Sequence, residues 1–148
     1  MAVRISTLAL IVALVGCKPS GPATTRTTSD AFATVAERAE FLNGYVAFRR
    51  TYETLDFDVA YRNNGGGLVP GPSDWDVRLV ATVPASELQA WVPTGAEASA
   101  PPDSPWLRTV PTALDLSGVS EWYTDGGRVV GVDRARRIVV YRLSSAPG

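Results

Sequence analysis

The spacing of hydrophobic residues predicts a helix near the start of the folded region. From Phe32 to Leu42 hydrophobic residues recur every three or four positions, with charged residues between them, which is typical of an amphipathic helix. Ser29 or Asp30 is the expected N-cap, because either side chain accepts hydrogen bonds from the first turn. Asn43-Gly44 is a plausible end. An extension through residues 45–48 fits the spacing equally well.

From Tyr52 onward the hydrophobic period changes to two residues. The segments Leu55–Tyr61 and Trp75–Val83 alternate hydrophobic with mostly polar residues, which predicts two half-buried strands. Residues 63–73 between them are rich in Gly, Asn and Pro and are expected to form a long loop. The simplest arrangement of the pair is an antiparallel hairpin.

The second half of the chain predicts mainly strands. Pro84–Trp91 is expected to form a short second helix, since proline is tolerated early in a helix. Residues 93–105 are rich in Pro, Ala and Ser and are expected to be irregular. Three β-rich runs separated by two turns then predict an antiparallel meander: 119–123, 128–132 and 137–143. Ile138–Val140 is hydrophobic at consecutive positions, which favours a central strand covered on both faces.

Together these elements predict an α+β fold over residues 29–148. We expect an antiparallel sheet of about four to five strands, with one longer N-terminal helix packed on one face and a short second helix. The whole chain has 148 residues. Once an N-terminal leader is subtracted, that length suits one domain and is too short for two.

The first sixteen residues have the composition of a secretory signal. Arg4 is followed by a hydrophobic run from Ile5 to Val15, and the small residue Gly16 precedes Cys17. The hydrophobic run is about half of the ~20 residues that a helix needs to span a bilayer. A permanent transmembrane helix is therefore not expected here.

The sequence Leu14-Val15-Gly16-Cys17 resembles the lipobox of bacterial lipoproteins. The resemblance covers the leader alone. It implies removal of residues 1–16, cleavage between Gly16 and Cys17, and a diacylglyceryl group on the Cys17 sulfur, often with acylation of the new amino group. In that class an Asp after the cysteine often marks retention in the inner membrane, so Lys18 favours the outer membrane, with the protein facing the periplasm or the cell surface.

Simple physical arguments agree with lipidation of Cys17. The chain has one cysteine, and an unpaired thiol is unusual in an exported protein. Two or three acyl chains make a nearly permanent membrane anchor, because each buried CH₂ group contributes about 0.8 kcal/mol. Residues 17–28 are rich in Pro, Gly and Thr and are expected to form the lipidated end and a flexible tether.

Composition restricts the chemistry. The chain has no histidine, which excludes a Ser-His-Asp triad and histidine metal ligands. A single cysteine excludes an internal disulfide and a cysteine zinc cluster. A formal net charge of -1 gives no basic face for nucleic acid, so no nucleic-acid partner is expected. We expect no cofactor beyond the covalent lipid, and an enzyme is the less favoured class.

Four aspartates are the strongest candidates for chemistry. If the two strands form a hairpin, their carboxylates approach one another, which would suit Ca²⁺ or an acid–base pair acting on glycans. The simpler interpretation is a solvated sheet face, balanced by Arg62 and Arg78 in cross-strand pairs. The four residues are Asp56, Asp58, Asp74 and Asp76.

Two further groups are candidates for binding. Arg134, Arg136 and Arg137 lie on an expected turn and would suit lipid phosphates, acidic glycans or a protein partner. Trp75 and Trp122 would suit a ligand groove. The favoured function is a membrane-anchored envelope lipoprotein that acts as a non-enzymatic binding module for a protein or another envelope component. The alternatives are a carboxylate-based glycan-acting enzyme and a small-ligand sensor.

Overall fold

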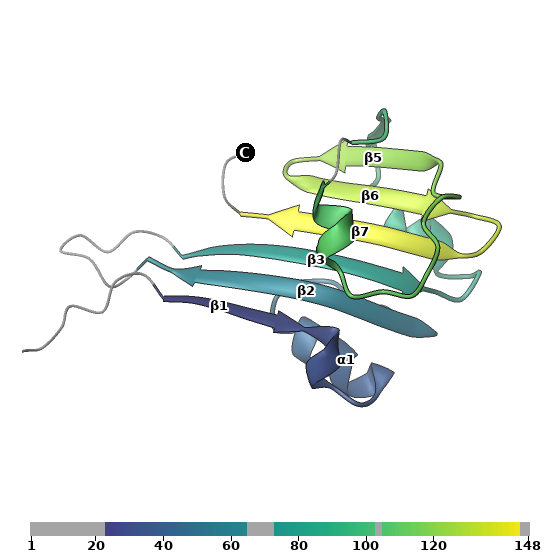
Figure 1. Ribbon diagram of the computed structural model, residues 1–148. Coiled ribbons are helices and arrows are strands. Elements are labelled where there is room, and N and C mark those ends of the chain that lie inside the picture. The colour runs from purple at the N-terminus through teal and green to yellow at the C-terminus, as the bar shows by residue number, and fades with distance from the viewer. Residues whose placement is uncertain (1–22, 65–72, 103–104, 146–148) are drawn as a thin grey trace, which may run out of the picture.

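A computed structural model describes residues 23–64, 73–102 and 105–145, and shows one antiparallel sheet (Figure 1). Seven strands are hydrogen-bonded in the order β1-β2-β3-β7-β6-β5-β4. Their bounds are β1 (Ala23–Thr28), β2 (Thr54–Asn63), β3 (Asp74–Thr82), β4 (Glu97–Ala98), β5 (Glu121–Asp125), β6 (Arg128–Asp133) and β7 (Ile138–Ser144).

The predicted α+β class is wrong, because helix is a minor component of the described chain. In those residues there is one α-helix, α1 (Val35–Leu42), eight residues long. Three short 3₁₀ segments accompany it: η1 (Ser29–Ala31), η2 (Leu88–Trp91) and η3 (Pro105–Thr109). The expected second helix is thus only a four-residue 3₁₀ turn, and the sheet has more strands than the four to five expected.

The helix is shorter than expected because it begins at a later cap. Thr34 is the N-cap, and its hydroxyl accepts a hydrogen bond from the Glu37 backbone N–H at 3.2 Å. The Glu37 carboxylate accepts the Thr34 backbone N–H at 3.0 Å, which completes a capping box. Phe32 therefore lies outside the helix. The C-cap at Asn43 agrees with the first of the two helix ends that the sequence allowed, and the extension through residues 45–48 does not form.

The predicted tether extends too far into the folded chain. Residues 17–28 were expected to be flexible, but Ala23–Thr28 forms the edge strand β1, paired with β2 over six residues. Four of these six residues are threonine, whose branched Cβ favours extended backbone. An edge strand needs no large hydrophobic side chain if its backbone is paired. The sheet thus begins at Ala23.

The predicted hairpin and meander are confirmed. β2 and β3 pair antiparallel, with Tyr61 opposite Trp75, and residues 65–72 of the expected loop lie outside the described ranges. β5, β6 and β7 form consecutive antiparallel pairs, and β7 also pairs with β3. The third strand of the meander is therefore central in the sheet (Figure 1).

Hydrophobic cores lie on both faces of the sheet. Val139 and Tyr141 of β7 belong to a first core, which also receives Leu42 from α1 and Trp91 from η2. Ile138 and Val140 belong to a second core, which Trp106 of η3 helps to cover. The consecutive hydrophobic residues of β7 are thus buried on opposite faces, as predicted.

Substitutions on the two faces should destabilise the protein to a similar extent. Leu79 is fully buried in the first core and Ile138 is 3% exposed in the second. We expect Leu79→Ala and Ile138→Ala each to lower the free energy of unfolding by about 2–5 kcal/mol, measured by urea denaturation. The exposed Ser86→Ala is the control. A near-zero effect of Ile138→Ala alone would contradict a second core.

Candidate functional site

A row of alternating charges lies on the same face of the sheet as the second core, beside its hydrophobic residues. Its first carboxylate, Asp58 on β2, has a side chain that is only 1% exposed. Arg26 of β1 donates to both Asp58 oxygens, at 2.7 and 2.9 Å, and Arg78 of β3 donates to Oδ2 at 3.2 Å. A buried carboxylate is costly unless it is paired, so the two arginines explain how Asp58 is tolerated.

The row continues through Asp76 to β7. Arg78 Nη2 donates to Asp76 Oδ2 at 2.6 Å, and Arg142 donates to both Asp76 oxygens at 3.0 Å. Burial alone would raise the pKa of Asp76, but the hydrogen bonds from Arg142 and Arg78 outweigh it and hold the pKa below its ordinary value. Arg78 also donates to the Thr109 hydroxyl at 2.8 Å, so the row helps to hold η3 against the sheet.

The four candidate aspartates do not form one carboxylate group: Asp58 and Asp76 are bridged by Arg78, and the other two have separate partners. Asp56 is paired with Arg38 of α1 at 2.8 Å, and Asp74 accepts a hydrogen bond from Asn64 Nδ2 at 3.0 Å. In the described parts of the chain, no group of three or more His, Cys, Asp or Glu residues is placed to hold a metal ion. The arrangement is that of a structural ion-pair row.

The three candidate arginines follow β6, at the turn into β7, and each already has an acidic partner. Arg134, Arg136 and Arg137 are between 39% and 46% exposed. Their carboxylate partners are, in order, Glu121, then Asp133 with Asp115, then Glu53. An external anion would have to compete with these pairs.

The two candidate tryptophans lie in different environments. Trp122 is 5% exposed within the second core, so it is not available at the surface. Trp75 is 38% exposed at the start of β3. It lines an apolar hollow of about 230 Å³ together with Gly44, Tyr45 and Tyr61, which we call the aromatic hollow.

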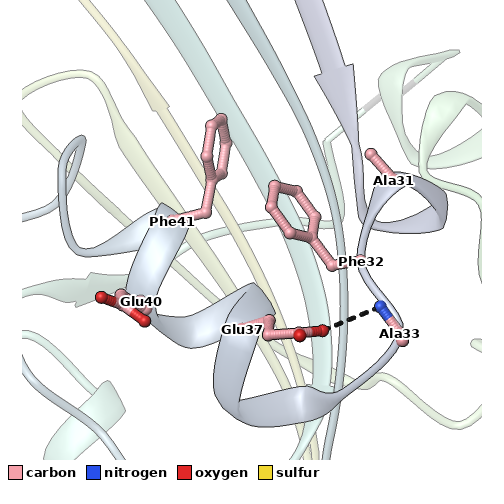
Figure 2. Close-up of a pocket in the computed structure, with 6 residues that line it drawn as sticks. All are labelled: Ala31, Phe32, Ala33, Glu37, Glu40 and Phe41. Atoms are coloured by element: carbon pink, nitrogen blue, oxygen red, sulfur yellow. Dashed lines mark hydrogen bonds between the residues drawn. The ribbon is translucent and has the colours of Figure 1, made fainter.

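A second, more open hollow lies beside α1, and we call it the acidic hollow. Its volume is about 540 Å³. Figure 2 shows the Phe32 and Phe41 rings beside each other, with centroids 4.9 Å apart. The lining residues are Ala31, Phe32, Ala33, Glu37, Glu40 and Phe41.

Local structure explains the acidic hollow. Phe32 and the N-cap Thr34 both have extended backbone dihedrals, and Glu37 Oε2 accepts the Ala33 backbone N–H at 3.0 Å (Figure 2). Both phenylalanine rings pack against Phe57 of β2, at 5.8 and 5.4 Å. The result is an apolar surface with acidic side chains at its rim.

The two rim carboxylates differ in their roles. Glu37 is committed to the start of α1, where a negative charge is favourable. Glu40 is exposed and takes part in none of the ion pairs among the described residues. The intervening Arg38 pairs with Asp56, so it does not neutralise the rim.

The sequence analysis did not identify the acidic hollow, because it placed Phe32 within the helix. One signal in the sequence points to it. Thr34-x-x-Glu37 has the spacing of a capping box, and such a box separates Phe32 from the helix.

Comparison with known proteins adds no family or fold assignment: no protein-family model, curated protein or solved structure matches this chain. Among the described residues, no helix combines the length and hydrophobicity required to cross a membrane.

The charge row predicts a specific loss of stability in acid. Because the folded-state pKa of Asp76 is depressed below 3.8, its contribution is present above that value and is lost as the pH falls through the folded-state pKa. We expect the free energy of unfolding to fall as the pH is lowered below about 4, and to fall less in Asp76→Asn. Urea denaturation at a series of pH values measures the free energy of unfolding, and Asp30→Asn, at an exposed position, is the control. Equal pH dependence in Asp76→Asn and the wild type would contradict the assignment.

Proposed function

We propose that this chain is a lipid-anchored protein of the bacterial cell envelope, which binds a partner protein through the acidic hollow. The location follows from the leader, in which Leu14-Val15-Gly16-Cys17 resembles a lipobox after a short hydrophobic run. Cys17 itself lies outside the described residues. Lipid on Cys17 holds the domain on the outer membrane, facing the periplasm or the cell surface.

The observation that carries the binding proposal is the pairing of an apolar surface with an uncompensated carboxylate. Phe32 and Phe41 supply the apolar surface, and Glu40 on the rim has no cationic partner among the described residues. A partner segment with a hydrophobic side chain next to Lys or Arg fits this chemistry. The hydrophobic group covers the rings, and the cation faces Glu40.

The acidic hollow is a better binding surface than the arginines of the β6–β7 turn. A partner that binds Arg134, Arg136 or Arg137 must first displace an internal carboxylate. A partner of Glu40 displaces only water, since Glu40 is exposed and unpaired among the described residues. The net cost of binding is therefore lower at the acidic hollow.

The charge row does not favour a glycan-acting enzyme. A carboxylic acid that donates a proton near neutral pH needs a raised pKa. Asp76 has a lowered pKa, because Arg142 and Arg78 stabilise its charged form more than burial disfavours it. We therefore propose a binding function for the domain.

Mass spectrometry of the protein purified from its native envelope tests the anchor. We expect the mature chain to begin at Cys17 and to carry a diacylglyceryl group on its sulfur. Cys17→Ala should remain an uncleaved precursor, and Ser20→Ala, three residues away, should be processed normally. A free thiol at Cys17, or an N-terminus at another residue, would contradict the proposal.

Site-specific photo-crosslinking in the envelope tests the partner surface. A photoreactive residue at the exposed position Ala33 should give a defined protein adduct, and one at the exposed position Ala85 should not. Glu40→Arg should lower the adduct yield by about fivefold, because it replaces an attraction with a repulsion. Glu40→Gln should have a smaller effect. Identical adducts from both positions, or a yield insensitive to Glu40→Arg, would reject the acidic hollow as the site.

A further inference from the structure

Trp75 is an exception to the burial of large hydrophobic side chains. Within the described residues it is the one large hydrophobic residue recorded as exposed, at 38%, and the other three tryptophans are between 4% and 7% exposed. It is opposite Tyr61 in the β2–β3 ladder and lines the aromatic hollow with Tyr45. A single exposed hydrophobic residue is ordinary, but Trp75 adjoins two further aromatic residues, and contiguous hydrophobic patches mark protein or membrane interaction sites.

The aromatic hollow lies toward the end of the sheet at which β1 begins. Thr25 of β1 pairs with Tyr61, and Tyr61 pairs with Trp75. Ala23, where β1 starts, is only two residues before Thr25. Figure 1 shows the start of β1, the end of β2, the start of β3 and the end of β7 at the same end of the sheet.

The covalent distance from Cys17 to this end is short. Six peptide units join Cys17 to Ala23, and a fully extended chain of that length spans about 20 Å. Trp75 lies two strands away from β1, or about 10 Å across the sheet. Asn63, at the near end of β2, pairs with Ala23, and Thr54, at the far end of the strand, is about 30 Å from Asn63.

From this geometry we propose that the aromatic hollow rests on the lipid surface in which the acyl chains of Cys17 are inserted. The inference depends on the proposed lipidation of Cys17, and it adds an orientation: the sheet stands with the Trp75 end at the membrane. Trp and Tyr have apolar rings with one polar atom, and such side chains concentrate at the boundary between lipid headgroups and acyl chains.

The charge at this end of the sheet fits lipid headgroups. Arg62 is exposed and enters none of the ion pairs among the described residues. Its cross-strand neighbour Asp74 is hydrogen-bonded by Asn64 instead. Arg62 is therefore free to face a lipid phosphate on the side of the sheet opposite the Trp75 ring.

Fluorescence quenching by brominated lipid tests the orientation on the lipidated full-length mature protein. The protein is reconstituted into phosphatidylcholine vesicles with bromine on the acyl chains near the headgroup. We expect quenching of the wild-type emission and loss of that quenching in Trp75→Phe, since the remaining tryptophans are buried. The matched control is Trp75→Phe with Ala85→Trp. This control places an exposed reporter after the far end of β3, where no quenching is expected.

The outcomes separate this inference from the proposed function. Wild-type protein that floats with the vesicles but is not quenched overturns the orientation and leaves the lipid anchor intact. Equal quenching at Trp75 and at the Ala85→Trp reporter also overturns it. Stronger quenching by bromine at the terminal methyl end than near the headgroup would show that the hollow holds an acyl chain, which rejects a surface contact. Protein that does not float, and carries no lipid by mass, overturns the anchor and the orientation together.

Discussion

The antiparallel pairing of β1 with β2 is the constraint on which the proposals depend. β1 contributes no residue to either hydrophobic core, so its backbone ladder and the Arg26–Asp58 pair hold it in place. Because Arg26 is 55% exposed, solvent screening weakens its attraction to Asp58. Asp58 itself is almost fully buried and therefore requires cationic partners. The pairing thereby determines where the chain enters the sheet, at Ala23, and it directs the chain through η1 to Phe32.

Both faces of the sheet contribute to stability, and the two hollows lie on one of them. β3 and β7 are buried on both faces along part of their length, so the centre of the sheet is the most constrained part of the structure. Where the second core ends, the charge row replaces hydrophobic contact and links β1, β2, β3 and β7 by hydrogen bonds between charged groups. Both hollows lie beyond these constrained parts, on the side of the first core, where aromatic side chains reach the surface.

Local patterns in the sequence were enough for the strands but not for the edge of the sheet. Alternation predicted the β2–β3 hairpin, and three consecutive hydrophobic residues predicted the double-sided burial of β7. β1 was missed because a threonine-rich segment pairs only when β2 is available, and the paired residues are 30 to 40 positions apart in the sequence. For the aspartates, the expected partner Arg78 is confirmed, since it pairs with both Asp58 and Asp76, whereas Arg62 pairs with neither. Arg142 was missed for the same reason as β1, because it is 66 residues from Asp76. The start of the helix was predicted wrongly for a local reason. Ser29 and Asp30 are also good N-cap residues and precede Phe32, whereas the N-cap in the structure, Thr34, follows it.

The two hollows are close together, which restricts the kind of partner that would fit the proposed binding surface. Phe41 lines the acidic hollow and Tyr45 lines the aromatic hollow, and their rings are 5.2 Å apart. Phe57, against which Phe41 stacks, is four residues from Tyr61 on β2, about 13 Å along the strand. With the aromatic hollow on lipid, the acidic hollow therefore lies within a few tens of ångströms of the headgroups, facing along the membrane rather than away from it. A partner that reaches it is itself at the membrane surface, and its cationic segment would be attracted both to Glu40 and to the acidic headgroups beneath it.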